Sequence, residues 1–193
     1  MAIPSQRITD KNLITRWLTE SKNKDLQIRR NAMFSLRHSS KEAQNFNAVL
    51  NAFGKALGDK DEKIVSDACG FFWDLRDTNF GKYVPKIAKL LSTRNVNISW
   101  SAAMALARAA DNEKPKSKVV KILIKKLSGP EPGLQIAVME SLREMAGSYG
   151  INISAALPKL EKLLESKNVR VRESAQSTIE KFKWQQKYFS KKK

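Results

Sequence analysis

The sequence predicts an all-α protein, a solenoid of stacked helical hairpins, and three observations favour this fold class. Residues 157–182 hold two amphipathic segments joined by a polar turn, with apolar residues three or four positions apart. A shift of 73 residues aligns six identical or similar residues in one ungapped register, including Pro158 with Pro85 and Ala175 with Ala102. Further copies recur at intervals of 34 to 37 residues. One such hairpin cannot bury its apolar faces alone, so the copies must stack.

This register divides a single expected domain, residues 1–193, into five hairpins, whose first and second helices we name the A and B helix. The expected hairpins are residues 10–38, 40–77, 82–110, 114–146 and 154–182, followed by a basic tail at 183–193. One small apolar position of each B helix defines the register, and it is occupied in turn by Ala32, Ala68, Ala102, Val138 and Ala175.

The first two hairpins are bounded by good capping and turn residues. The first A helix is expected to begin near Asp10, a favourable N-cap residue, and the first B helix to end at His38. The expected core residues of this hairpin are Leu13, Ile14, Trp17, Leu18, Ile28, Ala32 and Leu36. The second A helix covers about residues 40–57 and its B helix follows a turn at 58–61. The single cysteine, Cys69, lies on the apolar face of that B helix and is expected to be buried.

The last three hairpins follow the same pattern. The third A helix has Pro85 near its start, and the fourth A helix is expected at 118–127. Residues 128–133 are rich in glycine and proline, which predicts a turn before the fourth B helix. After the fifth hairpin, the tail either covers the last helices with its aromatic residues or forms a basic arm.

The fifth hairpin resembles a HEAT repeat. It has Pro158 early in its first helix, Asn168 at the turn, the pair Val169 and Arg170, and the small Ala175 in its second helix. The intervals are shorter than the ~40–47 residues usual for HEAT and armadillo repeats, and the ankyrin and tetratricopeptide patterns are absent. The resemblance implies a right-handed α-solenoid, an α-α superhelix of short HEAT-like repeats, with the A helices on the convex wall. It specifies fold better than function.

The charge balance favours an acidic partner. The chain has 36 Lys and Arg against 19 Asp and Glu, a formal charge of +17, which suits nucleic acid, an anionic membrane surface or an acidic protein. Lysines recur in register on the A helices, and neighbouring helices about 8–10 Å apart would align them in a row. The candidate binding residues are Lys55, Lys82, Lys86, Lys89, Lys118, Lys121, Lys125 and Lys162, with Lys191, Lys192 and Lys193 of the tail. An ordinary solvated face is the alternative, and nothing separates DNA from RNA.

The B helices suggest a second interpretation, a scaffold for proteins. Their arginines form no aligned row and are offset by acidic residues. Trp73 and Trp100 lie opposite the core stripes of their helices, so both are expected to face outward as partner anchors. From the register, the two positions are about 10 Å apart along the helix axis, too far to enclose one base.

Enzymatic function has one candidate motif. Residues 73–77 spell Trp-Asp-Leu-Arg-Asp, which resembles the Trp-Asp-x-x-Asp phrase of HEAT-like DNA glycosylases for alkylated bases, and implies Trp73 and Asp77 as site residues. The family's phrase opens its B helix, whereas here it closes one. The arginine expected in the next repeat falls at Trp100 or Ser101 and is missing. We therefore expect a non-enzymatic protein.

Other features narrow the environment of the protein. The sequence contains no phosphate-binding Gly-Lys loop, dinucleotide fingerprint or histidine-based metal set, so no cofactor and no metal are expected. The N-terminal residues lack the apolar segment of a signal peptide, and no apolar run approaches the ~18 residues that span a bilayer. A cytoplasmic or nuclear location is therefore expected.

Overall fold

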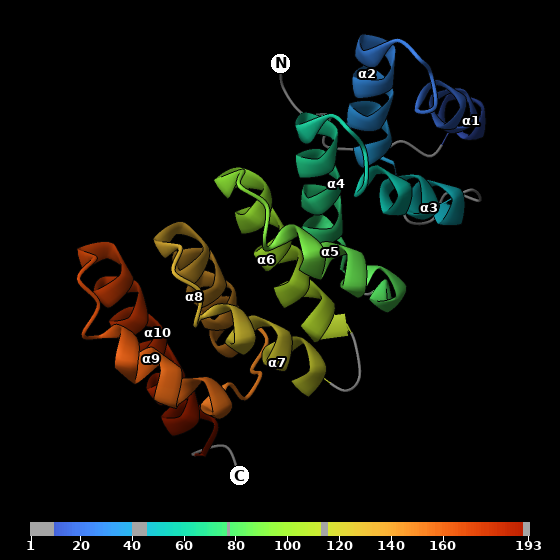
Figure 1. The fold of residues 1–193 in the computed structure, drawn as a ribbon. Helices are drawn as coiled ribbons and strands as arrows, with labels where there is room; N and C mark the ends of the chain where they lie inside the picture. Colours follow the sequence, from blue (N-terminus) through green and yellow to red (C-terminus); the bar gives the residue numbers. More distant parts are fainter. Residues whose placement is uncertain (1–9, 40–45, 77, 113–115, 191–193) are drawn as a thin grey trace. The chain divides into compact units, whose positions relative to one another are not determined.

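The computed structural model describes residues 10–39, 46–76, 78–112 and 116–190, and the regular elements in these ranges are all helices. The chain forms two compact units, residues 1–71 and 72–193. Five successive helical hairpins lie in the described ranges, two in the first unit and three in the second, with the helix α4 running across the unit boundary (Figure 1). The predicted all-α class is confirmed.

The first hairpin of the first unit begins close to where the sequence places it. Their helices are α1 (Lys11–Glu20), α2 (Leu26–Arg37), α3 (Phe46–Ala56) and α4 (Glu62–Asp74). The Asp10 carboxylate accepts hydrogen bonds from the backbone N–H groups of Asn12 and Leu13 at 2.8 and 3.2 Å, which confirms the predicted first N-cap. The predicted start of the second A helix falls on residues 40–45, which lie outside the described ranges.

Aromatic stacking joins the helices of the second hairpin. The rings of Phe53 in α3 and Phe71 in α4 stack with centroids 3.8 Å apart.

The first hairpin is less buried than predicted. In α1 only Ile14 is buried, while Leu13 is 39% exposed and Ile28 of α2 is 40% exposed. The prediction is confirmed for Ile14 and was wrong for Leu13 and Ile28, because within the described residues the terminal hairpin has a neighbour on one side only.

A bidentate ion pair connects the two hairpins of the first unit. Arg30 in α2 donates to both carboxylate oxygens of Asp61, with N···O distances of 3.0 and 2.6 Å. Asp61 also accepts a hydrogen bond from the backbone N–H of Ile64 and so caps α4. The hydrogen bond from Arg30 lowers the pKa of Asp61 below its ordinary value, against a smaller opposing effect of burial.

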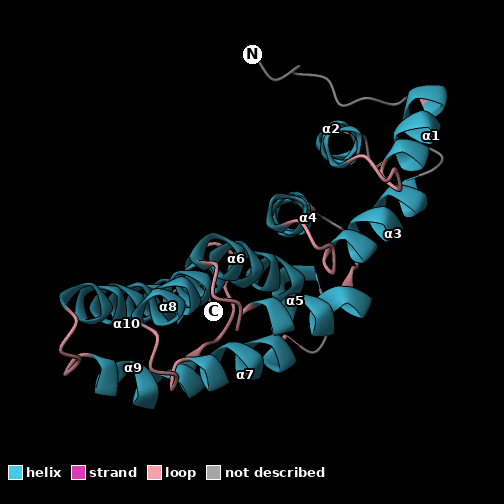
Figure 2. Cartoon of the chain, turned by 45° about the horizontal axis from the view of Figure 1, so that its top comes forward, coloured by secondary structure: helices cyan, strands magenta, loops and turns pink. Residues whose placement is uncertain are grey.

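In the second unit the A and B helices form two layers. The elements are η1 (Gly81–Tyr83), α5 (Val84–Leu90), α6 (Val96–Asn112), α7 (Ser117–Lys126), α8 (Pro132–Gly147), η2 (Ser154–Ala156), α9 (Leu157–Leu163) and α10 (Val169–Ser190). Figure 2 shows α5, α7 and α9 along one side and α6, α8 and α10 along the other. The B helices pack against one another in the order α6, α8, α10, and each A helix packs on its own B helix.

The predicted register is present in the buried residues. The register position is at most 1% exposed in all five B helices, at Ala32, Ala68, Ala102, Val138 and Ala175. Equivalent capping residues precede four of these helices, namely Asp25, Asp61, Asn95 and Asn168, and each accepts a backbone hydrogen bond. At the same place before α8, Glu131 makes no side-chain cap.

Two helix boundaries differ from the prediction. The expected turn at 128–133 is shorter, because α8 begins at Pro132. Proline suits the first helical position, where its missing N–H would have had no partner and its fixed φ is already helical. At the other end of the unit, α10 continues past the expected limit at 182 to Ser190, so residues 183–190 are helical.

Candidate nucleic-acid interface

Two A helices of the second unit begin with the same local structure, 73 residues apart. An asparagine side chain, Asn79 or Asn152, accepts a hydrogen bond from the backbone N–H two residues later, at 3.1 and 2.9 Å. The next residue, Phe80 or Ile153, is fully buried and anchors the chain. A 3-10 turn then leads into a helix with proline in its first turn. The helices α5 and α9 therefore begin with the same capping, 3-10 turn and proline pattern.

The A helices of the second unit present the predicted lysines to solvent. We name the seven exposed lysines of this layer the lysine face: Lys82, Lys86, Lys89, Lys118, Lys121, Lys125 and Lys162. The helices α5 and α7 contain no acidic residue. These two helices therefore carry positive charge and no negative charge of their own.

Most of the lysine face is not engaged in ion pairing. Within the described part of the chain, Lys89, Lys118, Lys121, Lys125 and Lys162 take part in no salt bridge. The ammonium group of Lys82 lies over the Tyr83 ring, 4.9 Å from its centroid. An exposed ammonium without a carboxylate partner can bind a phosphate without first breaking an internal pair.

Two other lysines connect neighbouring A helices, and the sequence did not reveal them. Lys126 Nζ at the end of α7 donates to Ser92 Oγ, after α5, at 2.6 Å. Lys159 Nζ in α9 donates to the backbone carbonyl of Ile124 in α7 at 3.0 Å. These bonds hold the layer together, whereas the adjacent Lys125 points to solvent. The A layer therefore contains connecting lysines as well as exposed ones.

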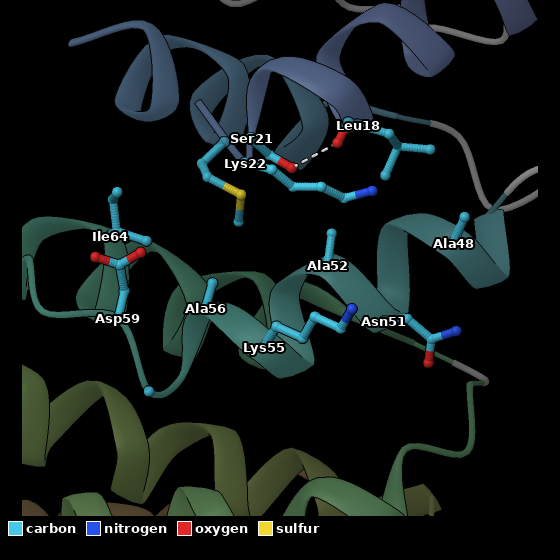
Figure 3. Close-up of a pocket in the computed structure, with 12 residues that line it drawn as sticks. Leu18, Ser21, Lys22, Ala48, Asn51, Ala52, Lys55, Ala56, Asp59 and Ile64 are labelled. Atoms are coloured by element: carbon cyan, nitrogen blue, oxygen red, sulfur yellow. Dashed lines mark hydrogen bonds between the residues drawn. The ribbon is translucent and has the colours of Figure 1, made fainter. Parts of the chain in front are cut away.

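Lys55 belongs to the first unit and lines a pocket there. Figure 3 shows Lys22 and Lys55 directed from opposite walls toward the same side of this pocket, with Ala52 between them. The pocket encloses about 420 Å³, and Asp59, which also lines it, forms a salt bridge with Arg29 at 3.4 Å. Lys55 is exposed, as predicted, and Lys22 is a second cation that the register did not single out. The alignment of Lys55 with the lysine face stays a prediction.

The two tryptophans of the B helices lie together, which corrects the predicted separation. Trp73 and Trp100 are both half-buried, and their rings meet edge to face with centroids 5.2 Å apart. Trp100 Nε1 also donates to the carboxylate of Glu140 in α8. The prediction compared backbone positions and neglected the reach of two indole side chains directed toward each other. Each ring is partly covered by other side chains of this unit.

An arginine of the next repeat contacts Trp73, but through its backbone. Arg108 Nε donates to the Trp73 carbonyl at 3.1 Å, and the guanidinium pairs with Asp111 at 3.3 Å. Its Cζ lies 4.7 Å from the centroid of the Tyr149 ring, and only 9% of Arg108 is exposed. Burial raises the pKa of Tyr149 to about 12, although Arg108 acts in the opposite direction. This cluster connects α4, α6 and the segment after α8.

Some predicted site residues lie outside the described ranges, namely Asp77 of the glycosylase motif and Lys191, Lys192 and Lys193 of the tail. Within the described ranges, no group of three or more metal-ligating side chains occurs. The same ranges contain no helix that combines the length and apolar character needed to cross a bilayer.

Comparison with known proteins identifies the fold. The sequence matches no protein-family model and no curated protein. Among solved structures, an engineered protein is 21% identical with a TM-score of 0.62, and the match covers 89% of this chain and 80% of the engineered protein. A designed armadillo repeat protein in complex with the peptide (KR)4 is 18% identical with a TM-score of 0.59, covering 88% and 81%. The chain is an all-α repeat solenoid. A computationally designed armadillo repeat protein for modular peptide recognition has the same identity and TM-score, covering 88% and 82%.

Proposed function

We propose that this solenoid is a non-enzymatic binding module that holds a nucleic-acid backbone on its lysine face. The observation that carries the proposal is a layer of seven exposed lysines on A helices, two of which contain no acidic residue. Lysine contacts with phosphates release counterions, and they provide affinity without reading base sequence. Weak sequence specificity and steep salt dependence follow from this mode of binding.

The proposal assigns separate roles to the lysines of the A layer. Lys89, Lys125 and Lys162 hold equivalent positions on successive A helices, and each is exposed. They would contact successive phosphates, and Lys55 and the C-terminal lysines are further predicted phosphate contacts. Lys126 and Lys159 would keep the helices in register, since their ammonium groups already donate to protein oxygens. Short repeats of the HEAT kind remain our interpretation of the solenoid.

Charge reversal tests the proposal. We expect K89E/K125E/K162E to abolish binding of a 20-base-pair DNA at 50 mM salt, measured by fluorescence anisotropy. The matched control is K11E/K24E/K60E, which changes three exposed lysines of the first unit and lowers the formal charge of +17 by the same six units. Wild-type protein that binds neither DNA nor RNA at this salt would contradict the proposal. Equal losses in both variants would mean that net charge, rather than the lysine face, determines binding.

Protein binding is a second candidate, supported by the likeness to designed armadillo proteins. One of these is in complex with the peptide (KR)4, and another was made for modular peptide recognition. Because this chain carries +17, an acidic peptide suits it better than a basic one. A pull-down that survives high salt and fails for a B-helix variant would favour this function over nucleic-acid binding.

A further inference from the structure

The C-terminal half of α10 combines exposed aromatic rings with lysines. Residues 181–193 contain six lysines, no acidic residue and four aromatic residues. Trp184 and Tyr188 are 53% and 44% exposed, and their rings stack with centroids 5.2 Å apart at an interplanar angle of 14°. They are one helical turn apart, so both rings project from the same side of the helix. Large exposed aromatic rings beside cations indicate a binding surface.

A lysine is positioned against this aromatic pair. The ammonium group of Lys181 lies 4.5 Å from the centroid of the Trp184 ring. The stem of Lys181 crosses Gly147 of α8, where an added Cβ would lie 2.3 Å from Lys181 Cε. The absence of a side chain at Gly147 therefore lets Lys181 reach the indole.

The groove beside Trp184 has polar groups of both signs. It lies between α8 and α10, encloses about 550 Å³ and is lined by Arg143, Glu144, Ser148, Ser177, Glu180, Lys181 and Trp184. Arg143 donates to Ser177 Oγ at 3.1 Å, and Glu180 accepts from Gln176 at 2.5 Å. Two carboxylates make this groove a poor place for a phosphate. They suit an uncharged nucleobase, whose edge offers hydrogen-bond donors and acceptors.

We propose that Trp184, supported by the stacked Tyr188 ring, binds an unpaired nucleobase in place of the Lys181 ammonium, so that the protein prefers single-stranded over double-stranded nucleic acid. A base stacked on the indole replaces the exposed cation–π contact, which is the weaker of the two interactions. The displaced Lys181 ammonium is then available to a neighbouring phosphate. In a duplex both faces of each base are already stacked, so this contact is lost. The inference rests on the proposed function, and it adds the class of nucleic acid.

Replacement of the ring tests the inference. We expect Trp184→Leu, which retains apolar bulk without a π face, to weaken binding of a labelled 20-nucleotide single strand by about 5- to 100-fold. Binding of the corresponding duplex should change by less than about twofold, because it uses the lysine face. Trp184→Phe should retain most single-strand affinity. Phe34→Ala, which removes a 60% exposed ring of the first unit, is the matched control and should change neither.

Heparin, a polyanion without bases, separates stacking from charge. Trp184→Leu should bind heparin like the wild type, and an equal loss for heparin and single strands would overturn the inference. If K89E/K125E/K162E loses all binding while Trp184→Leu binds single strands normally, the inference is wrong and the proposed function stands. If the wild type binds neither the 20-nucleotide single strand nor the corresponding duplex, quenching of tryptophan fluorescence by a six-nucleotide oligoadenylate tests base stacking directly. Quenching that Trp184→Phe removes supports stacking, and no quenching contradicts it.

Discussion

The salt dependence of binding gives the most direct measure of the lysine face. If each of its seven lysines contacts one phosphate of a duplex, the slope of log K against log salt is about −6, since each contact adds about −0.9. The variant K89Q/K125Q/K162Q removes three contacts without reversing charge, and its slope should be about −4. Between 50 and 200 mM salt, affinity should then fall about 10⁴-fold for the wild type and about 10²-fold for the variant.

The assay is fluorescence anisotropy with one 20-base-pair duplex at four salt concentrations. At 50 mM salt the variant should bind about 10³-fold more weakly, because each lost contact removes roughly a factor of 10 to 15. K11Q/K24Q/K60Q has the same net charge as this variant and should keep the wild-type slope, since these three lysines of the first unit are not part of the lysine face. A variant slope equal to that of the wild type would refute the reasoning, even if its affinity were lower. It would show that these three residues contact no phosphate.

Three further predictions concern stability and reactivity. Asp61→Asn keeps the helix cap but loses the ion pair with Arg30, so it should lower the free energy of unfolding in urea at pH 6. The difference from the wild type should vanish as the pH falls below 3.8, through the lowered pKa of Asp61. A difference that stays constant with pH would contradict this prediction. Cys69 is fully buried with its pKa raised to about 12, so Ellman's reagent at pH 8 should modify it only after unfolding. Ser141→Ala removes a buried hydrogen bond of 2.7 Å to the Ala103 carbonyl and should cost about 1 kcal/mol in urea unfolding, against no change for the exposed Ser128→Ala.

The repeat architecture was readable from the sequence because its signals are local and periodic. Small apolar residues at one register position, with Asn or Asp before the B helices, predict helix phase and helix start without knowledge of tertiary contacts. The first hairpin was predicted less well. Apolar spacing identifies a helix face but not whether a neighbour covers it, so Leu13 and Ile28 read as core residues and are partly exposed. The early start of α8 at Pro132 required weighing proline as a first helical residue and not as a helix breaker.

The sequence predicted that the candidate site residues are exposed, but it did not predict their contacts. Helical period alone predicts that Lys89, Lys125 and Lys162 lie opposite the apolar stripe, and all three are exposed. Lys126 follows Lys125 directly, yet it bonds to Ser92, because one residue rotates the side chain by about 100° toward the neighbouring helix. Such contacts depend on the distance between A helices, which periodicity does not contain. The stacking of Trp184 on Tyr188 was accessible from their spacing of four, once the helix was known to continue past residue 182.

The contacts of Trp100 change how the protein-scaffold function must be tested. This indole packs against Trp73 and donates to Glu140, so Trp100→Ala would remove an aromatic pair and a charged hydrogen bond inside the solenoid. Loss of a partner in that variant would reflect destabilisation as readily as a lost anchor. Trp100→Phe keeps an aromatic side chain but removes the Nε1–H donor and part of the bulk of the indole, and should cost about 1–2 kcal/mol in urea unfolding. In the Glu140→Ala variant, which lacks the acceptor, Trp100→Phe should lower the free energy of unfolding much less than it does in the wild type. Equal losses in the wild type and in Glu140→Ala would show that the hydrogen bond does not stabilise the fold. If Trp100→Phe, folded at the assay temperature, still loses a protein partner, the indole itself is the anchor.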